Sequence, residues 1–214
     1  MSDKTFPSHA RVVIVGGGVM GVGLAYHLAH EGWGPEVVLL EKAELTSGST
    51  WHAAANIHGL HDSTNISRIQ HYTMTLYKSL EDETGQSCGV FQPGSLYLAQ
   101  TEAREHQLRL QAAKAKLYGM NFHEVSRHEA ERLHPLVNFH DIRCIMWEPD
   151  GGNVDPSGVT NAYALGARKL GAEIVIDHPL DQLVKRDLRL PVQPRPRLAG
   201  VAHQHIDLGR AVVL

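Results

Sequence analysis

The sequence predicts an α/β protein that begins with a Rossmann-like parallel sheet and carries part of a second, α+β domain inserted into it. The first observation is Arg11–Val15, a β-branched run that ends in glycine, and the second is the apolar run Val37–Leu40. Short continuous apolar runs are typical of strands buried on both faces of a parallel sheet. Because Val22–His30 between them has leucines at helical spacing, the three segments predict one βαβ unit with a right-handed crossover.

The composition excludes several classes of protein. Hydrophobic residues make up 43% of the 214 residues, which is too apolar for a disordered chain, and the net charge of -3 provides no basic field for nucleic acid. No run reaches the roughly 20 apolar residues of a membrane span. Residues 1–10 lack the apolar core of a secretion signal, and Cys88 and Cys144 lie far apart and outside any metal-ligand spacing. We therefore expect a cytoplasmic protein or, in a eukaryote, one of the mitochondrial matrix, although no transit peptide is visible.

The middle of the chain predicts a long functional loop, followed by the helices and strands of a partial second domain. Residues 49–67 are polar and rich in histidine, and a connection of this length inside a compact domain often marks function. Helical periodicity resumes at 69–83, and residues 90–91 and 95–99 predict a hairpin or two neighbouring strands. Three further elements are expected: an amphipathic helix over 102–118 with a solvated charged face, a strand over 122–125, and a short helix capped by Ser126.

The last part of the chain predicts a return to the α/β layer. Asp155-Pro156-Ser157 is typical of a helix start, so we expect a helix over 159–170 and then a strand over 173–176. Prolines interrupt a hairpin pattern between 187 and 201, and residues 211–214 predict a buried strand. The expected domains are 1–88, the first part of the sheet domain; 89–148, a partial inserted domain; and 149–214, the second part of the sheet domain, incomplete at its C-terminus.

Three glycines follow the first predicted strand in the spacing Gly16-x-Gly18-x-x-Gly21. Gly16 permits a tight turn, Gly18 lets the backbone approach a pyrophosphate, and Gly21 lets the helix pack closely against the strand. The helix N-terminus then offers unpaired N–H groups to the phosphates. Glu41, at the end of the second strand, is placed to accept hydrogen bonds from ribose hydroxyls. The motif predicts a dinucleotide and leaves FAD and NAD open, and the alternative is a plain tight turn beside a solvated Glu41.

A second motif lies between residues 45 and 54. Its segment Ser47-Gly48-Ser49-Thr50-Trp51-His52-Ala53 resembles the Ser-Gly-Ser-Thr-x-His-Ala segment of the dimethylglycine/sarcosine dehydrogenase branch of the D-amino-acid-oxidase-like flavoprotein family. Four further segments extend the similarity over nearly all of residues 11–176: Leu80–Gly85, Phe91–Ser95, Arg132–Leu136 and Glu148–Pro156. The resemblance implies a Rossmann-like FAD-binding domain of the D-amino-acid-oxidase-like (GR2) type with part of an inserted α+β substrate domain.

In that branch a histidine ring nitrogen is bonded to the methyl group on carbon 8 of the flavin, and His52 is the matching residue. A neutral imidazole is nucleophilic enough to add to an electrophilic flavin methyl group, and Ser49 or Thr50 is expected to cap the short helix that carries it. The alternative is that His52, one of 15 histidines, only hydrogen-bonds a neighbour. The expected cofactor-binding residues are Gly16, Gly18, Val19, Met20, Gly21, Glu41, Lys42, Ser49, Thr50 and His52.

Candidate substrate residues lie after this motif. His58 and Arg68 are the candidates because they belong to the loop after His52, which the resemblance places near the flavin ring. The chain departs from its relatives here, since they commonly have a glycine soon after the alanines. A guanidinium offers two parallel donors, so Arg68 is a candidate partner for a substrate carboxylate, with an exposed charge at a helix start as the alternative. His58 and His61 are three residues apart, but no carboxylate or cysteine completes a ligand set, so no metal is expected.

The resemblance implies oxidation of an N-methyl amine of the dimethylglycine or sarcosine type by hydride transfer to FAD. Oxygen or an electron-transfer flavoprotein is the expected acceptor, and the carbon leaves as formaldehyde or passes to tetrahydrofolate bound by a C-terminal region. No residue is assigned as the catalytic base. Relatives continue well beyond residue 214, so we expect this chain to be truncated and inactive alone. The alternatives are a non-catalytic assembly or regulatory subunit and an NAD-linked dehydrogenase.

Overall fold

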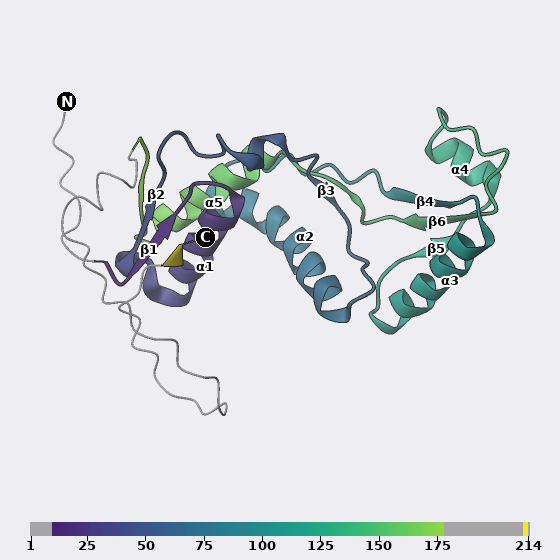
Figure 1. Ribbon diagram of the computed structural model, residues 1–214, viewed down its shortest axis with the longest axis horizontal. Helices are drawn as coiled ribbons and strands as arrows, with labels where there is room; N and C mark the ends of the chain where they lie inside the picture. The colour runs from purple at the N-terminus through teal and green to yellow at the C-terminus, as the bar shows by residue number, and fades with distance from the viewer. Residues whose placement is uncertain (1–9, 178–211, 214) are drawn as a thin grey trace, which may run out of the picture. The chain divides into compact units, whose positions relative to one another are not determined.

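The computed structural model describes residues 10–177 and 212–213 (Figure 1). The prediction for residues 187–201 lies outside the described residues. Internal contacts divide the chain into two compact units, residues 1–52 with 160–214 and residues 53–159. The domain boundaries expected after residues 88 and 148 do not coincide with these limits. The reason is that β3 (Asn56–Ile57) pairs with β7 (Gly152–Asn153), which draws both flanks of the expected insert into the second unit.

The first unit contains a four-stranded sheet in the order β8-β2-β1-β9, with every pair parallel. Its strands are β1 (Val12–Val15), β2 (Val37–Leu40), β8 (Glu173–Val175) and β9 (Val212–Val213). Ile14 pairs with Leu39 on one side and with Val212 on the other. Ile14 and Leu39 are completely buried, as expected for apolar runs in a covered parallel sheet. The four strands predicted for this layer are confirmed, the last one at residues 212–213.

Two helices of the first unit pack through small and aromatic residues. α1 (Val19–Leu28) begins four residues after β1 ends, and α5 is Pro156–Lys169. A Cβ on Gly23 of α1 would lie 3.7 Å from the ring of Tyr163 of α5, and the rings of Tyr26 and Tyr163 have centroids 5.2 Å apart. α1 and α5 are therefore in contact through Gly23, Tyr26 and Tyr163, with room for a methyl group at residue 23.

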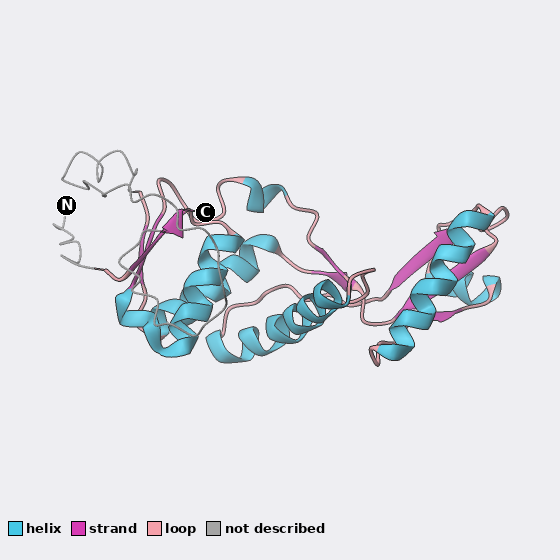
Figure 2. Cartoon of the chain, turned by 60° about the horizontal axis from the view of Figure 1, so that its bottom comes forward, coloured by secondary structure: helices cyan, strands magenta, loops and turns pink. Residues whose placement is uncertain are grey.

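The second unit contains an antiparallel sheet in the order β4-β6-β5, whose strands are labelled in Figure 1 and drawn in magenta in Figure 2. Its strands are β4 (Ser95–Ala99), β5 (His123–Glu124) and β6 (Cys144–Glu148). Residues 90–91 and 95–99 were expected to form a hairpin or two neighbouring strands. The strand over 95–99 is confirmed as β4, but the pairing with residues 90–91 is wrong. Phe91 forms an isolated bridge with Asn153, while β4 pairs along its whole length with β6, a strand that the sequence did not predict.

The second unit also contains three helices: α2 (Thr64–Thr84), α3 (Glu102–Leu117) and α4 (Arg127–Leu133). Leu108 of α3 is fully buried in a cluster with Phe122 and Met146, so α3 covers one face of the sheet. The predicted cap of α4 is confirmed, since the Ser126 hydroxyl accepts a hydrogen bond from the Glu129 N–H at 3.2 Å. None of the described helices is long and apolar enough to cross a membrane.

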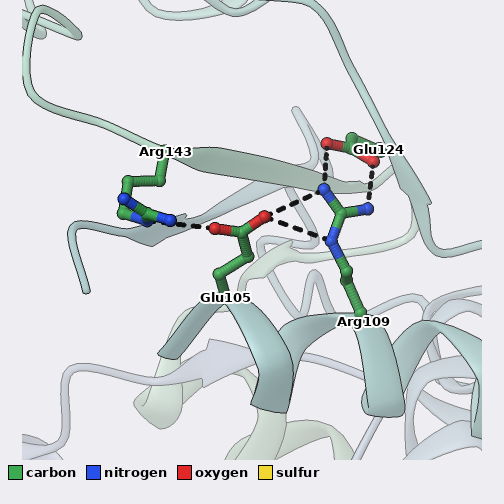
Figure 3. A network of polar contacts seen from close by, with 4 residues as sticks. All are labelled: Glu105, Arg109, Glu124 and Arg143. Carbon is green, nitrogen blue, oxygen red and sulfur yellow. Dashed lines mark hydrogen bonds and ion pairs between the residues drawn. The ribbon is translucent and has the colours of Figure 1, made fainter. Parts of the chain in front are cut away.

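A network of charged side chains joins α3 to the sheet (Figure 3). Arg109 makes a paired contact with both carboxylate oxygens of Glu124, at 2.7 and 3.1 Å, and also contacts Glu105 one turn earlier. Glu105 in turn accepts a hydrogen bond from Arg143 at 3.0 Å. The charged face of this helix, expected to be only solvated, therefore forms ion pairs with residues of the sheet and its loops. Because Arg109, Glu124 and Arg143 are about half exposed and Glu105 remains partly exposed, the network orients α3 more than it stabilises the fold.

Shortening Leu108 tests the assignment of this core. Leu108→Ala removes a fully buried side chain and is expected to lower the free energy of unfolding by about 2–5 kcal/mol. Leu117→Ala, on the same helix but 83% exposed, is the matched control and is expected to change it by less than about 0.5 kcal/mol. Urea denaturation followed by circular dichroism measures both, and equal losses would contradict the assignment.

Candidate nucleotide-binding site

The turn between β1 and α1 requires glycine at the positions that the sequence singles out. Gly16 has a φ of +112°, a conformation that side-chain-bearing residues rarely adopt, and its N–H donates to the Leu40 carbonyl at 2.8 Å. A Cβ on Gly21 would overlap the carbonyl oxygen of Gly16. A Cβ on Gly18 would lie 2.9 Å from the Thr50 hydroxyl oxygen. Strand, turn and helix are thus packed as closely as backbone atoms allow.

The N-terminus of α1 is arranged to receive an anion. Gly18 is the N-cap and has no side chain with which to cap the helix, and the first turn contains no acidic residue. The Val19 N–H donates to the Thr50 hydroxyl at 2.9 Å, while no hydrogen bond among the described residues uses the N–H groups of Met20 or Gly21. Unpaired N–H groups and the positive end of the helix dipole favour a negatively charged ligand such as a phosphate.

Glu41 holds the glycine turn from the adjacent strand. Its side chain is buried, and its two carboxylate oxygens accept hydrogen bonds from the N–H groups of Gly17 at 2.6 Å and Ala43 at 2.9 Å. Each carboxylate oxygen can accept a second hydrogen bond, so these contacts leave capacity for ribose hydroxyls. The carboxylate therefore fixes the turn itself, a role that the motif spacing did not reveal.

These residues enclose a pocket of about 400 Å³, within the size range of small-molecule sites. It lies entirely in the first unit. Every expected cofactor-binding residue except His52 lines it: Gly16, Gly18, Val19, Met20, Gly21, Glu41, Lys42, Ser49 and Thr50. The sequence analysis missed Val15, Ser47 and Gly48, although the last two belong to the second motif. The exposed helix terminus and the acidic strand end fit the diphosphate and ribose of a dinucleotide.

The segment that carries His52 is a short 3-10 helix, Ser49–His52. Thr50 is its buried residue, whereas Trp51 is 66% exposed and His52 is also exposed. Of the two residues expected to cap this helix, Thr50 is corrected, because its hydroxyl accepts a hydrogen bond from the Val19 N–H at the N-terminus of α1, whereas the Ser49 cap stays a prediction. His52 does not line the phosphate pocket, and it follows Thr50 by two residues.

The two candidate substrate residues lie in different pockets of the second unit. His58 lines a pocket of about 290 Å³ and Arg68 one of about 680 Å³. His58 and Arg68 are separated because of where each lies relative to α2. Gln70 of α2 contacts the His58 ring, with 3.3 Å between the Nε2 atoms of the two side chains. Residues two apart on a helix point in different directions, so Arg68 does not face His58. Within the part of the chain that the structure describes, no group of three or more metal-ligating side chains occurs.

Comparison with known proteins identifies the family. The model of the FAD dependent oxidoreductase family, of the D-amino-acid-oxidase type, matches residues 11–213. The chain therefore belongs to this family of FAD-dependent oxidoreductases.

Curated relatives refine this assignment. The chain is 38% identical to human mitochondrial dimethylglycine dehydrogenase over 86% of its length and 34% identical to human mitochondrial sarcosine dehydrogenase over 95%, but spans only 21% and 22% of those proteins. It is 36% identical to the mouse mitochondrial pyruvate dehydrogenase phosphatase regulatory subunit, over 78% of this chain and 19% of that one. The solved structure of L-proline dehydrogenase from P. horikoshii matches with a TM-score of 0.73 at 26% identity, over 80% of this chain and 45% of that chain.

A methyl group at Gly21 tests the glycine turn. Gly21→Ala is expected to weaken FAD binding by about 5- to 150-fold, because the new Cβ displaces α1 from the Gly16 carbonyl, and such overpacking costs about 1–3 kcal/mol. Gly23→Ala, two residues further along α1 and outside the pocket, is the control, since a Cβ there would lie in ordinary van der Waals contact, 3.7 Å from the Tyr163 ring. Titration followed by flavin fluorescence measures both, and an unchanged affinity in Gly21→Ala would rule out this role.

The Thr50 hydroxyl offers an isosteric test. Thr50→Val leaves the Val19 N–H without its acceptor and is expected to destabilise the protein by about 0.5–2 kcal/mol, the usual range for a lost helix cap. Thr50→Ser keeps the hydroxyl and is expected to stay closer to the wild type. Thermal unfolding compares the two, and a serine variant as unstable as the valine variant would show that the methyl group matters instead.

Proposed function

We propose that this chain is the nucleotide-binding part of an FAD-dependent enzyme that oxidises an N-methyl amine of the dimethylglycine or sarcosine type. The observation that carries the proposal is the pocket at the N-terminus of α1, where unpaired N–H groups, the glycine turn and Glu41 come together. Membership of the FAD-dependent family favours FAD over NAD as the ligand. The relatedness to dimethylglycine and sarcosine dehydrogenases supports the amine as substrate.

Residues of this chain are proposed to bind both the phosphates and the ribose in the nucleotide half of FAD. The N–H groups of Met20 and Gly21 are proposed to donate to the phosphates, and Glu41 to accept from the ribose hydroxyls while it keeps the turn in place. FAD, when bound, supplies the oxidising power, by taking a hydride from a methyl carbon of the amine. Hydrolysis of the oxidised amine would give formaldehyde and the demethylated amine, or its carbon would pass to tetrahydrofolate. Oxygen or an electron-transfer flavoprotein is the proposed final acceptor.

His52 is the proposed covalent anchor of the flavin. Its exposed ring, at the end of a short helix whose Thr50 touches the nucleotide pocket, leaves the imidazole free to meet a ligand. Because FAD is an extended molecule, the flavin end lies beyond the phosphates, so an anchor outside the phosphate pocket is compatible with the proposal. The bond would join a ring nitrogen to the 8-methyl carbon of the flavin in place of a C–H bond. The methyl group and the imidazole would each lose a proton, and the two electrons would reduce the flavin ring, which the proposed final acceptor would reoxidise.

A second candidate is a regulatory or assembly subunit that keeps the nucleotide fold without the chemistry. The observation that favours it is the 36% identity to the pyruvate dehydrogenase phosphatase regulatory subunit. The two candidates differ in their cofactor: the enzyme requires bound flavin, whereas the subunit does not. We propose that the 214 residues alone lack activity in either case, because they span about a fifth of the dehydrogenases that they match.

Denaturing electrophoresis distinguishes these proposals. The wild-type protein is expected to show flavin fluorescence in its denatured band, and His52→Ala to lose it because the covalent bond passes through the imidazole. His71→Ala, which removes another exposed histidine, is the control and is expected to keep the fluorescence. Equal fluorescence in His52→Ala and the wild type would exclude His52 as the anchor. Protein that purifies without any flavin would favour the regulatory candidate.

A further inference from the structure

The second unit contains a small polar pocket that the nucleotide site does not use. Its volume is about 290 Å³, close to the lower limit for small-molecule sites. The side chains and backbone around it come from β3, β4, β7 and the loops beside them: Asn56, Ile57, His58, Pro93, Gly94, Ser95, Tyr97, Gly152 and Asn153. No Lys, Arg, Asp or Glu side chain lines it. The charge of ligand that it favours is therefore set by charged groups just behind the lining residues.

A buried carboxylate lies directly behind this wall. Glu148 is only 4% exposed, and its two oxygens accept hydrogen bonds from the Gly59 N–H at 2.7 Å and the Tyr97 hydroxyl at 2.6 Å. Both partners are neutral, and no salt bridge among the described residues involves Glu148. Burying a carboxylate is costly unless a positive charge compensates it, so the neighbourhood favours a cation.

Tyr97 connects that carboxylate to the pocket. Burial, and then its hydrogen bond to Glu148, raise the pKa of the phenol well above its usual value, so the group remains protonated at neutral pH. Its single proton is donated to Glu148, and the oxygen can therefore only accept a further hydrogen bond. The ring is fixed edge-on against Phe122, with centroids 5.2 Å apart. The phenol thus suits a ligand that donates an N–H.

Two asparagines at the same pocket can supply hydrogen-bond donors for a negatively charged ligand group. Asn56 and Asn153 are cross-strand partners in the β3–β7 pair, and directly opposed side chains lie on the same face of a sheet. The backbone N–H and carbonyl of Asn153 are engaged with Phe91, whereas no hydrogen bond among the described residues uses either asparagine side chain. Two side-chain amides on one face offer N–H donors that match the oxygens of a carboxylate.

We propose that this pocket binds a small zwitterionic amine, with Tyr97 accepting from its ammonium group, Glu148 providing the counter-charge, and the amides of Asn56 and Asn153 donating to its carboxylate. The inference rests on the proposed function for the identity of the amine and makes the second unit its binding site. It also replaces Arg68 as the carboxylate partner, because Arg68 lines the other pocket.

Isothermal titration of the flavin-free 214-residue chain tests the proposal. The probes are N,N-dimethylglycine and 3-methylbutanoate, which has the same shape and carboxylate but carbon in place of the charged nitrogen. Dimethylglycine is expected to bind at least about tenfold more tightly, because hydrogen bonds to charged groups carry roughly that factor or more. Equal affinities for the two probes, or no binding of dimethylglycine, would overturn the proposal.

Two matched phenol deletions locate the site. Tyr97→Phe keeps the ring against Phe122 and is expected to weaken dimethylglycine binding about tenfold. Tyr118→Phe removes a hydroxyl from the larger pocket, where it contacts Thr64, and is expected to leave the affinity unchanged. Loss of binding in Tyr118→Phe but not in Tyr97→Phe would place the amine elsewhere and contradict the proposal. Because no flavin is present, a failure to bind FAD would disprove the proposed function without affecting this titration.

Discussion

The close contact between the first strand and the first helix is the constraint on which the nucleotide site depends. The carbonyl of Gly16 occupies the space where a side chain on residue 21 would begin, so the helix can start there only with glycine. Glu41 and Thr50 then hold the turn from outside, through the N–H groups of Gly17 and Val19. The result is a helix terminus whose remaining N–H groups are fixed in position before any ligand arrives, which lowers the entropic cost of binding.

Both units use a buried carboxylate in the same way. Glu41 in the first unit and Glu148 in the second each accept a hydrogen bond from a backbone N–H distant in sequence, and each lies at the end of a strand. A carboxylate in such a place fixes a loop and also sets the local electrostatic potential. For Glu41 the neighbouring helix terminus provides positive potential, whereas Glu148 has only neutral partners among the described residues. This difference is why the second site is inferred to attract a positively charged group.

The sequence was most informative where local chemistry decides the structure. The glycine spacing and the β-branched runs predicted β1, α1 and β2 because each depends on residues within a few positions of one another. It failed for β6, whose residues Cys144–Glu148 form a strand only because β4 lies beside them, and for the hairpin at Phe91, whose partner is Asn153. The Thr50–Val19 hydrogen bond joins residues 31 positions apart, and no periodicity encodes it. The separation of His58 from Arg68 likewise follows from the direction of side chains on α2.

The central claim is that a dinucleotide diphosphate binds the N-terminus of α1. The most direct measurement is a titration of the isotope-labelled chain with ADP, followed residue by residue through backbone amide chemical shifts. The account predicts that the largest changes occur at Met20 and Gly21, with little change at residues of the second unit such as Ala99. Unchanged amide signals at Met20 and Gly21 at saturating ADP, or larger changes in the second unit, would contradict it.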